Sequence, residues 1–149
     1  MPDIRLDEIV HKTFDILKAD AGIKHLNWEL GRLTPFGLRS FPAGTVSIGP
    51  GTELGWSTSP SGFGGIVAVR IALYTADHTG VAASEATIQD LISKTYKALF
   101  TLANIQLDIT GYSTKPWLTS VATQDVISNA EASPAWAEAV LIANYTIRS

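Results

Sequence analysis

Two segments of this chain can form long strands with one uninterrupted apolar face, and they constrain its fold more than any other feature. Side chains alternate between the two faces of a strand, so every second residue shares a face. In residues 65–75 (GIVAVRIALYT) and 134–148 (PAWAEAVLIANYTIR), the apolar faces consist of Val67, Val69, Ile71 and Leu73, and of Ala137, Ala139, Leu141, Ala143, Tyr145 and Ile147. Other elements must cover these faces.

Two amphipathic segments can supply that cover. Apolar residues recur at intervals of three and four in residues 4–20, and again in the segment SEATIQDLISKTYKALFTL, which begins at Ser84. This spacing places them on one face of a helix. Asp3 and Ser84 are residue types that commonly cap a helix N-terminus, so we expect one helix after each.

Two further strands complete the expected sheet. Residues 41–48 and 117–128 read as strands, and the turn-rich connector at residues 129–133 has the length of a hairpin loop. The element order is then helix, two strands, helix, two strands. The sequence predicts an α+β fold in a single domain of residues 1–149, with a mostly antiparallel four-stranded sheet and two main helices packed on it.

A near-repeat raises the question of internal duplication. The pentapeptide IALYT at residues 71–75 is echoed by IANYT at residues 142–146. Aligning the two puts Ile71 on an apolar strand face and Ile142 on the opposite one, and a one-residue slip reverses every side chain of a strand. The echo therefore reflects composition and not duplication.

The opposite faces of the two long strands are less polar than water exposure requires. They carry Arg70 and Tyr74 on one strand, and Trp136, Val140 and Ile142 on the other. Charged residues make up only 17% of the chain, against roughly 25% in an average globular protein. Either the first helix covers this second face or a neighbouring subunit does. We predict a subunit interface around these five residues.

The overall charge and composition exclude several classes of protein. The net charge of −3 argues against a dedicated nucleic-acid binder, which would carry a basic face. The chain has no cysteine, so it has no disulfide framework and no thiolate site, as expected in a reducing compartment. It also lacks the apolar run of a signal peptide or of a membrane span, and we expect no membrane association.

The residues that could carry chemistry do not form a recognisable site. His11, His25 and His78 lack the spacing of a metal pair. Serines at positions 57, 59 and 61 precede Asp77-His78, but no nucleophile elbow is present, and neighbouring side chains in a strand point to opposite faces. The glycines of residues 49–55 do not fit a dinucleotide loop. We expect no catalytic residue, no metal and no cofactor.

Two long loops contain aromatic residues. Residues 30–41 and 49–64 hold Phe36, Phe41, Trp56 and Phe63 among glycines and prolines. Loops of this length are usually functional or disordered, and exposed aromatics commonly anchor protein contacts. Trp56 and Phe63 are therefore predicted contacts with a neighbouring subunit or another protein, unless they fold back onto the core.

An amphipathic N-terminal helix, a strand and a long loop are followed by the strand GGIVAVRIALYT, the helix SEATIQDLISKTYKALFTL and a closing hairpin that ends in AVLIANYTI. This order resembles that of the tail terminator proteins of long-tailed bacteriophages, and of related tail-completion proteins at the head–tail junction. The resemblance covers nearly the whole chain and includes no signature motif. The loop GTELGWSTSPSGFG is longer than the pattern of that family.

The resemblance implies a ring-forming structural protein of the virion. Such a ring, commonly a hexamer, caps the tail tube, stops its polymerisation and offers its other side to the head–tail connector, while DNA passes through the lumen unread. The resemblance also implies assembly in the host cytoplasm and a final place at the head-proximal end of the tail. Alternatives are a neck protein of similar fold, a monomeric ligand-binding domain (for carbohydrate, for example) and a small enzyme.

Overall fold

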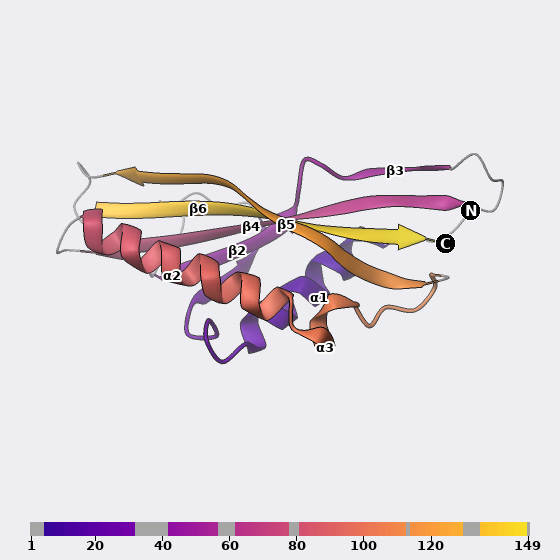
Figure 1. Cartoon of the computed structure of the whole chain (residues 1–149), viewed down its shortest axis with the longest axis horizontal. Helices are drawn as coiled ribbons and strands as arrows, with labels where there is room; N and C mark the ends of the chain where they lie inside the picture. Colours follow the sequence, from indigo (N-terminus) through magenta and orange to yellow (C-terminus); the bar gives the residue numbers. More distant parts are fainter. Residues whose placement is uncertain are drawn as a thin grey trace.

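The computed structural model describes residues 5–31, 42–56, 62–77, 81–112, 114–129 and 135–148. Its helices are α1 (Leu6–Ala19), α2 (Val81–Leu99) and α3 (Leu102–Ile105). Its strands are β1 (Asn27–Leu30), β2 (Ala43–Ile48), β3 (Glu53–Trp56), β4 (Phe63–Asp77), β5 (Thr114–Asn129) and β6 (Ala135–Arg148). Figure 1 shows the long strands crossing the molecule as one twisted layer with the helices on one side of it.

All six strands belong to one mixed sheet. Its order is β1-β2-β4-β6-β5, and β3 pairs with the first residues of β4. The β1–β2 pair is parallel and the other pairs are antiparallel. β4 and β6 pair along 14 positions, from Gly64–Arg148 to Asp77–Ala135, and form the centre of the sheet.

The expected four-stranded sheet with two helices is wrong, because the described residues alone form six strands and three helices. The additional strands β1 and β3 have four residues each, too few for an alternating pattern to show. β3 lies inside residues 49–64, which the sequence presented as an irregular loop. The helix α3 is a single turn that follows α2 directly, and the expected helix, which runs to Leu102, includes only its first residue.

The longer elements agree closely with their sequence patterns. The helix expected over residues 4–20 is α1, Leu6–Ala19, and its expected cap Asp3 lies outside the described residues. The strand expected over 65–75 extends to Phe63–Asp77, and the one expected over 117–128 extends to Thr114–Asn129. Because these elements carry strong apolar periodicity, tertiary contacts change only their ends.

The inner face of the sheet lies against both long helices. The apolar faces expected for β4 and β6 are buried in one core together with residues of α1 and α2, such as Ile9, Leu17, Ile88 and Leu99. The echo between the two strands is out of phase, as expected, because Ile71 is in this core while Ile142 packs against a separate cluster on the other face. The first helix therefore shares the inner face with α2.

A glycine allows β1 to join this core. The indole nitrogen of Trp28 donates a hydrogen bond to the Ile23 carbonyl at 2.8 Å, which fixes the ring over β2. A Cβ atom at Gly44 would overlap this ring. Gly44 pairs with Trp28 in the parallel β1–β2 ladder, so only a residue without a side chain fits there.

Candidate assembly interface

The face of the sheet that points away from α1 and α2, here called the outer face, is lined by strand residues in the part of the chain that the structure describes. The register places Ala43 opposite Tyr74, and Ala72 opposite Val140. These four residues form a small apolar cluster, separate from the main core, against which Ile142 packs. Such satellite clusters commonly lie beneath loops or subunit contacts.

All five predicted interface residues of the sheet lie on this face. Arg70 pairs with Ile142, Tyr74 pairs with Glu138, and Trp136 lies at the end of the β4–β6 ladder opposite Ala76. The sequence pattern thus grouped these five residues on one face of the sheet. The pattern could not order the residues across the sheet, because that order depends on the register between strands far apart in the chain.

The centre of the outer face is closed within one subunit, which the sequence did not indicate. Arg70, Tyr74 and Val140 are only 8%, 1% and 7% exposed. Trp136 and Ile142 are half-buried at its margin. The margin is therefore the part of this face that is accessible to another protein, and the three central residues stabilise the subunit itself.

A partly buried ion pair crosses the outer face. Arg70 Nη2 lies 3.6 Å from Glu138 Oε1, and both side chains are largely covered. Burial raises the pKa of the Glu138 carboxyl, with Arg70 opposing and the Asp125 carboxylate adding to the increase. Burial also raises the pKa of Tyr74, and the Glu138 carboxylate adds to it. Sequence patterning placed Glu138 on this face but gave no sign that it pairs with Arg70.

Several hydrogen-bonding groups of this face have no partner in the described parts of the chain. They are Thr45 Oγ1, Ser47 Oγ, Arg70 Nη1 and Trp136 Nε1, all of them buried atoms. Ser47 and Arg70 are register partners on β2 and β4. A buried donor without an acceptor costs roughly 1–3 kcal/mol, and native proteins contain few of them. Because these atoms are buried in the single subunit, they lower its stability and cannot reach an acceptor on a neighbouring molecule without rearrangement.

The two predicted aromatic contacts lie elsewhere. Trp56 and Phe63 are register partners in the β3–β4 hairpin, at the opposite end of β4 from Tyr74. Phe63 is 7% exposed and is therefore part of the subunit interior. The structure does not bring this pair together with the outer-face cluster.

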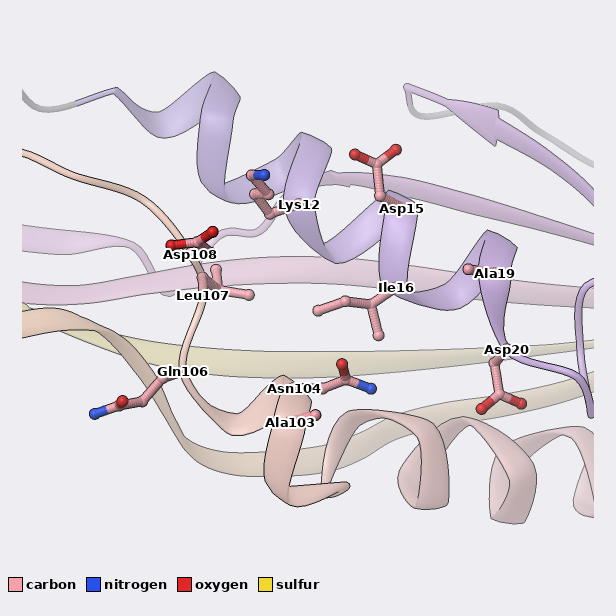
Figure 2. A pocket seen from close by; sticks show the side chains of 10 residues that line it. All are labelled: Lys12, Asp15, Ile16, Ala19, Asp20, Ala103, Asn104, Gln106, Leu107 and Asp108. Atoms are coloured by element: carbon pink, nitrogen blue, oxygen red, sulfur yellow. The ribbon is translucent and has the colours of Figure 1, made fainter.

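A cleft of about 410 Å³ lies on the helix side, between α1 and residues 103–108 (Figure 2). Three of its polar side chains are engaged within the chain. Asp108 accepts a hydrogen bond from Lys115 at 2.9 Å, which holds the pKa of that carboxyl below its usual range. Asp20 Oδ1 accepts from the Gly22 amide, and Asn104 Nδ2 donates to the Ala98 carbonyl. The cleft presents no pairing of a nucleophile with a base.

The other candidate groups remain apart. His11 and His25 are exposed, on α1 and on the turn before β1. His78 and the serines at positions 57, 59 and 61 lie outside the described residues. Within the described ranges, no three His, Cys, Asp or Glu side chains are grouped so that they could hold a metal ion. None of the helices described is long and apolar enough to cross a membrane.

Comparison of the sequence with known protein families and with curated proteins finds no match. Comparison of the structure with solved structures does find matches, and among them is a chain in the virion of a native gene transfer agent particle. The two superpose with a TM-score of 0.55 and 15% sequence identity, over 92% of each chain. The protein therefore shares its fold, from end to end, with a component of a virion.

Proposed function

We propose that this protein is a structural component of a phage-like virion. The observation that carries the proposal is the fold shared with a gene transfer agent virion chain over 92% of both chains. A likeness of that extent involves the whole sheet and its helices. The predicted lack of catalytic residues, metal and cofactor belongs to the same proposal.

In its specific form, the proposal is a tail terminator. Copies of the chain form a ring, with six as the expected number, that caps the tail tube and offers its other side to the head–tail connector. The order of elements in the sequence supports this form. A net charge of −3 also suits a lumen through which DNA slides without being held.

Contacts with other proteins are assigned to the margin of the outer face. Trp136 and Ile142 are half-buried there, so part of each side chain is accessible to another protein. Tryptophan side chains are typical anchors of protein interfaces. Arg70, Tyr74 and Val140 are covered in the single subunit and are not proposed to touch a partner. Trp56 remains a proposed contact at the β3–β4 hairpin, whereas Phe63 is buried in the subunit.

The test combines size and location. Light scattering and negative-stain images of the purified protein are expected to show rings, and a particle that lacks the protein is expected to carry overgrown or headless tails. A 15.9 kDa monomer at all concentrations, together with normal tails in its absence, would contradict the proposal. That monomer would favour a ligand-binding domain or an enzyme. A tagged ring found at the connector, away from the tube end, would identify a neck protein of similar fold.

A further inference from the structure

The exposed large apolar side chains fall into two groups, one near each of the two opposite edges of the sheet. Seven such residues occur in the described part of the chain. One group, here the β1 side, lies on or next to the edge formed by β1, β2 and β3: Leu30, Ile48 and Ile66. The other group, here the β5 side, lies on β5 and at the end of α2: Phe100, Leu102, Val126 and Ile127. Each side exposes apolar surface that a partner would cover.

On the β5 side, the backbone of the edge strand is open along only part of its length. Gln106 forms an antiparallel bridge to Trp117, and the Leu107 amide donates to the Pro116 carbonyl at 2.8 Å. These contacts close the beginning of the edge. The described residues provide no strand beyond β5 for the remainder, and from Asp125 to Asn129 its pairing with β6 is free of bulges. A regular open edge of this kind can accept a further strand.

The helix α2 extends this surface. The Tyr96 hydroxyl lies 3.1 Å from the hydroxyl of Thr123 on β5, and the Tyr96 ring stacks on Phe100 at a centroid distance of 6.3 Å. Leu102 follows at the corner between α2 and α3 with 90% of its surface exposed. Val126 lies on the same face of β5 as Thr123. The β5 side thus exposes apolar side chains from the second half of the strand and, separately, from the end of the helix.

The edge strand on the β1 side runs in the direction that allows antiparallel pairing with β5 of another copy. β1 is parallel to β2, and each of the next three pairs in the sheet is antiparallel, so β5 runs opposite to β1. Two copies placed side by side by rotation about an axis along the strands would bring β5 of one against β1 of the next. That pairing would be antiparallel, the more stable arrangement.

We infer that the β5 side of one copy binds the β1 side of a second copy. This inference rests on the proposed ring, and it names the surfaces through which the ring closes. Pairing of β5 with β5 of another copy would leave Leu30, Ile48 and Ile66 exposed, whereas head-to-tail contact covers both groups. A head-to-tail contact repeated around an axis gives a closed ring when the rotation closes.

The native chain has no cysteine, so single cysteines can report this contact. Glu29 on β1 pairs with Thr45, and Ile127 on β5 pairs with Glu138, which places both on the outer face. A mixture of Glu29→Cys and Ile127→Cys proteins, treated with a short bifunctional thiol cross-linker, is expected to give covalent dimers. Neither protein alone should give them, and the double variant should give a ladder that ends at the ring. A mixture of His11→Cys with Ile127→Cys is the matched control.

Three outcomes would overturn the inference. Dimers from Ile127→Cys alone would show β5-to-β5 pairing. Rings in solution without cross-links above the His11→Cys control would show that the β5 and β1 sides do not form the contact, and the proposed function would still stand. A protein that is monomeric at all concentrations would contradict both the contact and the proposed ring. Leu102→Glu, at a position 90% exposed, should keep the fold and raise the concentration of half-association by roughly tenfold or more.

Discussion

The hydroxyl of Tyr145 is a polar group in the inner core. The residue is fully buried on β6 and packs beneath α1, where the Thr13 hydroxyl already donates to the Ile9 carbonyl at 2.9 Å. The Tyr145 oxygen has no hydrogen-bond partner in the described residues. Burial raises the pKa of Tyr145 to about 12, although the nearby Thr13 hydroxyl opposes the increase. The group therefore costs stability even while it is neutral.

We expect Tyr145→Phe to raise the free energy of unfolding at pH 7 by about 1 kcal/mol, because it removes an unsatisfied buried hydroxyl. The parent protein should also lose stability as the pH rises from 10 to about 12, since the unfolded chain releases the proton before the folded one does. Tyr145→Phe should lack that loss. Urea unfolding at pH 7 and at alkaline pH measures both effects. A destabilised variant at pH 7 would show that the hydroxyl is bonded.

The carboxyl of Glu138 gives a second pH dependence of stability, and here too stability falls as the pH rises. Its folded-state pKa is raised from the ordinary 4.5, mainly by burial. Its contribution to stability is therefore complete below pH 4.5 and is lost as the pH rises through the folded-state pKa. The thermal midpoint of Glu138→Gln should rise relative to that of the parent over this range. A difference between the two proteins that stays constant with pH would show that Glu138 titrates normally.

Val140 and Ile142 lie on the same strand, β6, but differ in burial. Val140 lies in the apolar cluster of the outer face with 7% exposure, and Ile142 lies two residues further along at the accessible margin. Val140→Asp should destabilise the subunit by roughly 2–5 kcal/mol, because it buries a charge. Ile142→Asp should change the midpoint far less, because that residue is only half-buried. Thermal unfolding of both variants tests this, and equal loss of stability would place Ile142 in the subunit core.

Among the elements, β1 depends on a close contact that one methyl group would break. We expect Gly44→Ala to destabilise the protein by about 1–3 kcal/mol, as overpacking does, since a Cβ there overlaps the Trp28 ring. The emission of Trp28 should also shift toward that of an exposed indole. Gly55→Ala on β3 is the matched control, because no atom lies within 4 Å of its added Cβ. An unchanged midpoint for Gly44→Ala would mean that β1 is not held by this ring.

The elements also show which information the sequence carries. α1, α2, β4 and β6 were predictable because each buries one face with a regular period along many residues. β1 owes its place to parallel pairing with β2, which no local pattern encodes. The pairing of Arg70 with Glu138 likewise depends on the β4–β6 register. Sequence therefore located the outer face, and only the fold revealed that its centre is closed.

At the scale of the whole molecule, assembly should be visible as a dependence of stability on concentration. Association that occurs only between folded chains raises the thermal midpoint as protein concentration rises. We expect this increase for the parent and a much smaller one for Leu102→Glu, which removes the most exposed apolar side chain of the β5 side. His11→Glu, on the exposed surface of α1, should behave as the parent does. A midpoint independent of concentration in all three proteins would argue against association of folded subunits.

The contacts of Gln106 and Leu107 with the start of β5 have a consequence for solubility. A sheet edge left open along all of β5, from Thr114 to Asn129, could template unlimited addition of strands, as in amyloid growth. The bridge to Trp117 and the bulges before Asp125 confine the open part to the second half of the strand. A fibril needs long flat edges at which every strand can recruit the next. This chain can thus remain free of fibrils while it still presents a short edge that one partner can occupy.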